Sequence, residues 1–152
     1  AKILKDRNVE FSITMIGEPA LKKDKDYEQK LKSLIDELGL QENFNFLGKI
    51  NHQDLAPYYQ SHHLFIHLSK TGSLDKTLLE AMSCGMNVLS SSDAARHFLP
   101  VDLLFNENNV LELADKIEKT NKKGPNGQLR QYVAENHDLD KLVNKIAGFI
   151  NK

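Results

Sequence analysis

The stretch SKTGSLDKTLLEAMSCG, residues 69–85, decides how the chain around it is interpreted. Its start is rich in small and hydroxyl-bearing residues and predicts a loop, and the apolar residues that follow predict a helix that ends at Gly85. A loop that leads into a helix N-terminus suits an anion, because it offers backbone amides and the positive end of the helix dipole. Glu80, farther along the helix, can accept hydrogen bonds from neighbouring sugar hydroxyls. The stretch therefore predicts a pocket for a sugar-nucleotide diphosphate.

The segments on either side of this stretch predict strands that alternate with helices. Residues 64–68 form a short apolar run before the loop, and residues 87–91 form another after the helix, so both predict buried strands. The apolar stripes near the C-terminus predict helices that pack on the core. The remaining expected strands are residues 9–16, 43–47 and 103–105, and the remaining expected helices are residues 27–38, 52–60, 110–117, 129–135 and 139–150.

Such an alternation favours an α/β fold, a Rossmann-like parallel sheet with helices on both faces. Gly17, Gly48 and Ser69 each follow directly after a predicted strand. Ligands of these sheets bind beyond the carboxyl ends of the strands. We therefore expect the three residues to share one edge of the sheet, and we expect the site at that edge.

A diphosphate needs hydrogen-bond donors and positive charge close to it. Gly72 and Ser73 are small enough for the backbone to approach it closely, and Lys70 and Lys76 can balance its charge. The scheme needs neither a metal nor a cofactor, and the sequence shows no group of carboxylates with the spacing of metal ligands. The hydroxyls expected to donate to the phosphates belong to Ser69, Thr71, Ser73 and Thr77.

Several of these residues also fit structural roles. Lys76 and Glu80 stand four positions apart and fit an ion pair on a helix surface. Ser73 fits the N-cap of the helix. His67 fits either a core position in its strand or a position that faces the site.

The composition is that of an ordinary globular domain. The chain has 152 residues, of which 40% are hydrophobic and 27% are charged, and this length suits one domain. A net charge of −1 gives no reason to expect a nucleic-acid partner, and no apolar run is long enough to cross a bilayer. The single cysteine, Cys84, excludes an internal disulfide and fits a reducing cytosol. Because the chain begins at Ala1, we expect a piece of a longer protein.

Three segments resemble the C-terminal, donor-binding half of the retaining group 1 glycosyltransferases, family 4 of the GT-B fold. Phe11–Gly17 resembles the glycine-ended strand that opens this half. Residues 44–50 resemble its Phe-Leu-Gly-x-Val segment, which precedes a helix with a tyrosine pair, here Tyr58-Tyr59. Residues 69–90 resemble its Ser…Leu-Leu-Glu-Ala-Met-Ala-x-Gly-x-Pro-Val core.

The resemblance implies roles for individual residues. Glu80 matches the second of the family's paired glutamates, which binds the ribose of the donor. The first glutamate, which contacts the donor sugar or the diphosphate, would fall on Gly72, so part of its role is expected from Asp75 or Lys76. The positions expected to bind the donor are Gly17, Gly48, Ile50, Ser69, Thr71, Gly72, Ser73, Asp75, Lys76, Thr77 and Glu80, with Gly48 to Ile50 beside the base.

The resemblance also implies the activity of a whole enzyme. That enzyme would transfer a sugar from a UDP-, GDP- or similar donor to a glycan or lipid-linked acceptor, in the cytoplasm or at the inner face of a membrane. This chain has no counterpart of the N-terminal, acceptor-binding half, so we assign no catalytic residue and expect little or no turnover from the chain alone. Two alternatives are a degenerate domain that serves as an interaction module and one half of a GT-B nucleotide-sugar epimerase.

Overall fold

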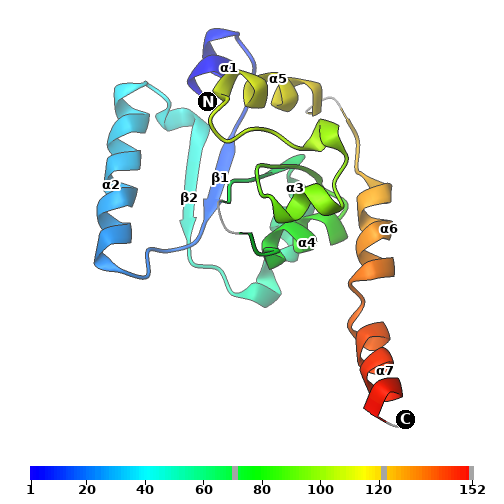
Figure 1. Cartoon of the computed structure of the whole chain (residues 1–152). Helices are drawn as coiled ribbons and strands as arrows, with labels where there is room; N and C mark the ends of the chain where they lie inside the picture. The colour runs from blue at the N-terminus through cyan, green and yellow to red at the C-terminus, as the bar shows by residue number, and fades with distance from the viewer. Residues whose placement is uncertain (70–71, 121–122, 151–152) are drawn as a thin grey trace. The chain divides into compact units, whose positions relative to one another are not determined.

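The fold repeats one arrangement twice: a strand, a helix and a second strand parallel to the first (Figure 1). The computed structural model describes residues 1–69, 72–120 and 123–150, and the chain divides into two compact units at Leu55. In the first unit, α2 (Lys22–Glu37) connects β1 (Ile13–Ile16) to β2 (Phe44–Gly48). In the second unit, α4 (Lys76–Ser83) connects β3 (Leu64–His67) to β4 (Asn87–Ser90).

The strands of the described residues therefore form two parallel pairs, where the sequence led us to expect a single sheet. Each pair is closed by a helical crossover, as parallel strands require. The α/β class and the order of these strands and helices agree with the prediction.

The N-terminal segment holds a short helix that the sequence did not predict, α1 (Lys2–Asp6). Leu4 of this helix is buried, and its carbonyl accepts a hydrogen bond from the Val9 amide. Asn8 adopts a positive φ of 55° and turns the chain out of the helix. The strand β1 begins at Ile13 and not at Val9 as predicted.

The helix α2 buries a narrower stripe than its sequence predicts. Ile35 is buried, and Leu31 and Leu38 are half-buried on the same face. Tyr27 and Leu34, which keep the helical spacing, are 69% and 49% exposed. The strands of this unit have only four and five residues, so they offer too little apolar surface to cover a wider stripe.

The predicted helix over residues 52–60 is divided in two, a 3-10 turn η2 (His52–Asp54) and the helix α3 (Ala56–Ser61). Pro57 explains the restart, because its ring favours the first turn of a helix and cannot continue one that began upstream. A second short 3-10 turn, η1 (Gln41–Asn43), leads into β2.

The hydrophobic core of the second unit lies between α4, β4 and the helix α6 (Gly127–Asn136). The helix α4 turns Leu78, Ala81 and Met82 inward, and each is fully buried. The helix α5 (Val110–Thr120) contacts β4. The other fully or nearly buried apolar residues are Met86, Val88, Leu89, Ala95, Leu99, Leu103, Leu104, Phe105 and Leu129.

The weak fifth strand predicted at residues 103–105 is present as a single bridge. Leu104 pairs with Ser90 in parallel, and the Phe105 amide donates to the Ser90 carbonyl over 3.0 Å. Two 3-10 turns, η3 (Ala94–His97) and η4 (Val101–Leu103), fill the segment between β4 and this bridge.

The last helix, α7 (Leu139–Ile150), contradicts the expectation of a core-facing stripe, because none of its residues is buried. It continues beyond α6 at the C-terminal end of the second unit (Figure 1). No helix among the described residues is long and apolar enough to cross a membrane. The apolar side chains of α7 that are about half exposed or more are Leu139, Leu142, Val143, Ile146, Phe149 and Ile150.

We expect Leu89→Ala to lower the free energy of unfolding by about 2–5 kcal/mol, because Leu89 is fully buried and its loss leaves a cavity. The matched control is Leu139→Ala, since Leu139 is 70% exposed and its change should stay within about 0.5 kcal/mol. Urea denaturation followed by circular dichroism measures both. Equal losses for the two variants would contradict the packing described for β4.

Candidate functional site

The parallel register of β3 and β4 brings two polar side chains to the same level at the carboxyl ends of the strands. His67 is the register partner of Ser90, and their side chains are bonded, with 2.9 Å between Nδ1 and Oγ. Both residues are buried, His67 at 6% exposure and Ser90 at 0%. The Phe65 ring lies two positions earlier on the same strand and stacks with the imidazole at 6.3 Å between centroids. His67 is therefore a core residue at the strand end.

Asp75 joins this pair from the start of α4. Its carboxylate Oδ2 lies 2.7 Å from His67 Nε2. The hydrogen bond from His67 is the main cause that lowers the pKa of Asp75 below its usual value; a hydrogen bond from Ser69 also lowers it, and burial opposes both. Asp75 is therefore ionised at neutral pH.

The N-cap of α4 is Asp75 and not Ser73, so the N-cap alternative for Ser73 is wrong. The helix starts at Lys76, two residues later than a cap at Ser73 would give. Although aspartate is a favoured capping residue, its side chain accepts no hydrogen bond from the first amides of α4. Instead of these amides, His67 is the hydrogen-bond partner of the Asp75 carboxylate.

Serine, histidine and aspartate in contact also describe the triad of serine hydrolases. Ser90 does not fit the nucleophile of such a triad, because it has no exposed surface and its oxygen accepts the Ser92 amide at 3.1 Å. The three residues are therefore a structural network that links β4, β3 and α4.

The loop residues expected to meet the diphosphate are open to solvent. Gly72, Ser73, Lys76 and Thr77 are exposed. Ser69 is half-buried, and its amide donates to Ser91 Oγ at 3.4 Å. Lys70 and Thr71 lie outside the described residues.

Glu80 lies on α4 four residues after Lys76 and three after Thr77, on the side of the helix away from the core. It is half-buried, and its carboxylate accepts a hydrogen bond from the Tyr59 hydroxyl of α3 at 3.2 Å. Burial, and then the charge and hydrogen bond of Glu80, raise the pKa of Tyr59 to about 12. Tyr59 therefore stays protonated as a donor and orients the carboxylate.

The first unit brings Gly17 and Gly48 together at the ends of β1 and β2, where the Gly17 amide donates to the Gly48 carbonyl at 2.8 Å. Their φ angles are +140° and +66°, which favour glycine. Open space surrounds the position of a Cβ at both residues. Ile50, two residues after Gly48, is half-buried.

The candidate residues thus fall into two groups. Gly17, Gly48 and Ile50 belong to the first unit, and the positions from Ser69 to Glu80 belong to the second. The sequence analysis missed the roles of Tyr59, Ser90 and Ser91 and left that of His67 open. The signal for His67 and Ser90 was their place as polar residues at the ends of two apolar strands.

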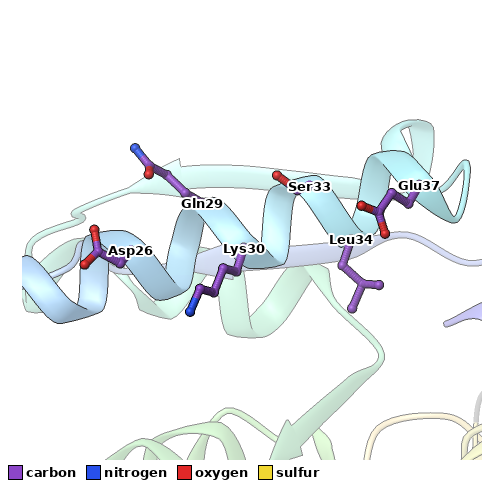
Figure 2. A pocket seen from close by; sticks show the side chains of 6 residues that line it. All are labelled: Asp26, Gln29, Lys30, Ser33, Leu34 and Glu37. Carbon is purple, nitrogen blue, oxygen red and sulfur yellow. The ribbon is translucent and has the colours of Figure 1, made fainter.

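A surface hollow on the first unit contains none of these candidates. Figure 2 shows that all its labelled lining side chains come from one helix, α2. Its volume of about 710 Å³ would suit a small ligand, but charges of both signs line it and no second element contributes a polar group. Among the residues that the structure describes, no group of three His, Cys, Asp or Glu side chains could hold a metal ion.

Comparison with solved structures identifies the fold. The Anabaena protein Alr3699/HepE, crystallised with UDP, superposes with a TM-score of 0.81 at 21% identity, over 93% of this chain and 41% of that one. Sucrose-phosphate synthase of Thermosynechococcus elongatus superposes with a TM-score of 0.81 at 17% identity, over 99% of this chain and 40% of that one. A glycosyltransferase of Rickettsia africae superposes with a TM-score of 0.77 at 19% identity, over 97% of this chain and 41% of that one. The chain thus spans about 40% of the length of these proteins.

No curated protein matches the sequence. Residues 1–140, by contrast, match the family of glycosyl transferases group 1. This match covers most of the chain and confirms the resemblance that the motifs suggested. The chain belongs to the group 1 glycosyltransferases and has the fold of their donor-binding, C-terminal GT-B half.

Proposed function

We propose that this chain is the donor-binding domain of a retaining glycosyltransferase that moves a sugar from a nucleotide diphosphate to a glycan or lipid-linked acceptor. The observation that carries the proposal is the start of α4. There an exposed loop meets a helix whose N-cap carboxylate is bonded elsewhere, so the first amides are not capped by that side chain. Helix starts of this kind bind phosphate groups.

The solved relatives support a nucleotide-sugar donor. The Anabaena protein has been crystallised with UDP, with UDP and glucose, and with UDP-glucose. In the present chain the diphosphate would meet the amides at the start of α4, and the exposed Lys76 would balance part of its charge. Stabilising the departing diphosphate is the electrostatic part of sugar transfer. We assign no metal and no cofactor to this scheme.

The carboxylate of Glu80 is suited to accept hydrogen bonds from the ribose of the donor. Tyr59 donates to one of its carboxylate oxygens, and a carboxylate has further lone pairs that accept hydrogen bonds from two sugar hydroxyls. Because Glu80 lies on the same side of α4 as Thr77, one bound nucleotide can reach both the helix start and the carboxylate. Gly48 to Ile50 would lie beside the base.

We propose that the exposed apolar side of α7 packs against the N-terminal, acceptor-binding domain of the whole enzyme. Six large apolar side chains of this helix are about half exposed or more, which is costly for a surface that stays in water. The solved relatives have more than half of their length outside the matched region, enough for a second domain. We therefore expect the chain alone to transfer little or no sugar.

We expect the chain to bind UDP or GDP at up to millimolar concentration, since the helix start and Glu80 are both accessible. Isothermal calorimetry measures the binding, and circular dichroism confirms that the sample is folded. A folded sample that binds neither nucleotide would contradict the proposal and favour the interaction module.

We expect Glu80→Ala to weaken UDP binding by about 10- to 100-fold, the effect of losing hydrogen bonds to a charged group. Binding of inorganic pyrophosphate, which has no ribose, should change little. Glu135→Ala is the control, because Glu135 is an exposed carboxylate on α6. Equal losses for UDP and pyrophosphate would show that Glu80 does not bind the ribose.

The pKa of Tyr59 tests the contact that orients Glu80. A pKa raised to about 12 stabilises the folded state below the ordinary value of 10.0, and this contribution is lost as the pH rises toward 12. In Glu80→Ala the pKa should fall, because the charge and the hydrogen bond of Glu80 are removed. Ultraviolet absorbance of ionised tyrosine follows the titration, with Tyr59→Phe to assign the signal. An unchanged titration in Glu80→Ala would contradict the contact.

A further inference from the structure

His67 is buried beside the site, and the proposed function does not use it. One ring nitrogen reaches Ser90 of β4 at 2.9 Å, and the other reaches Asp75 at the start of α4 at 2.7 Å. The side chain thus joins the two ends of the loop between β3 and α4, the loop that would meet the diphosphate.

The partners of His67 decide the direction of its hydrogen bonds. The Asp75 carboxylate is ionised and only accepts, so Nε2 must carry a proton and donate. Ser90 Oγ accepts the Ser92 amide at 3.1 Å, and its own hydrogen is available to donate to Nδ1. Neutral imidazole with the proton on Nε2 satisfies every partner.

The loop is tied to β4 on its other side as well. The Ser91 amide donates to the His67 carbonyl at 3.1 Å, and the Ser69 amide donates to Ser91 Oγ at 3.4 Å. The side chains of His67 and Ser69 both bond Asp75 at the far end of the loop, and the bond from His67 contributes most to the lowered pKa of Asp75.

Without His67, the Asp75 carboxylate has a clear alternative. Asp75 is the N-cap residue of α4, with the extended backbone that capping requires (φ −80°, ψ 131°). A rotated aspartate at this position accepts a hydrogen bond from the second amide of the helix, here Thr77, whereas the third amide, Leu78, already donates to the Asp75 backbone carbonyl at 3.2 Å. The carboxylate would then occupy an amide that a phosphate needs and place a negative charge beside it.

We propose that His67 is a positioning residue that keeps the start of α4 open to a nucleotide diphosphate by holding the Asp75 carboxylate away from the helix amides. The inference rests on the proposed function for the ligand and on the described contacts for the geometry. It assigns Asp75 the role of a competitor that His67 restrains, and not that of a direct phosphate ligand.

The test is a rescue experiment with UDP and calorimetry. His67→Leu removes the imidazole donor of the Asp75 carboxylate, leaves only the weaker restraint from Ser69, and should weaken UDP binding about tenfold or more. The double variant His67→Leu with Asp75→Ala removes the competitor and should recover most of that loss. His67→Gln, whose amide can still donate to Asp75, should bind UDP nearly as the wild type does. A double variant as weak as His67→Leu would overturn the inference.

Nuclear magnetic resonance gives a readout that needs no nucleotide. The ¹⁵N spectrum of the His67 ring should show a proton on Nε2, and the amide signal of Thr77 should shift in His67→Leu but return in the double variant. An Nε2 without a proton, or a Thr77 amide that does not move in His67→Leu, would overturn the inference even if UDP binds. If this amide responds as expected but the wild type binds no nucleotide, the proposed function fails, and the role of His67 in nucleotide binding fails with it.

A matched pair of serines controls for damage to the core. Ser90 and Ser92 are both buried, and the Ser92 hydroxyl is the buried side-chain oxygen that finds no hydrogen-bond partner among the described residues. Ser90→Ala removes a partner of His67 and should weaken UDP binding, whereas Ser92→Ala should leave it unchanged. If His67→Leu does not fold, His67→Asn, which is too short to reach Asp75, replaces it in the comparison with His67→Gln.

Discussion

The start of α4 is held to β3 by the hydrogen bond from the imidazole of His67 to the carboxylate of Asp75. Parallel pairing sets His67 opposite Ser90, and the serine in turn fixes the ring. The ring then fixes the residue that begins α4. The pairing of β3 with β4 therefore fixes the residue that begins α4, through the side chain of His67. Both ends of the loop between β3 and α4 are held by hydrogen bonds.

The elements that local patterns determine were predictable from the sequence. The apolar run at residues 64–67 and the helix that follows Asp75 lie close to where periodicity places them. Gly17 and Gly48 end their strands with positive φ, as glycines after strands suggest. Burial of Leu78, Ala81 and Met82 follows from their spacing on one side of α4.

The remaining features depend on contacts between distant parts of the chain. The Asp75 side chain bonds His67 of β3 and does not cap α4, a contact that no local pattern encodes. Tyr59 meets Glu80 across two helices, so their contact could not be inferred from spacing. The apolar residues of α7 have the same spacing as those of a helix that packs on a core. The sequence alone could not show that no other part of the described residues covers them.

The arrangement of the strands also bears on how the chain acquires its structure during synthesis. Each parallel pair is built from one contiguous stretch, residues 13–48 for the first and residues 64–90 for the second. Each ladder can therefore close without any residue of the other stretch. Because ribosomes release the N-terminus first, the β1–β2 ladder can close while residues of the β3–β4 ladder are still being translated.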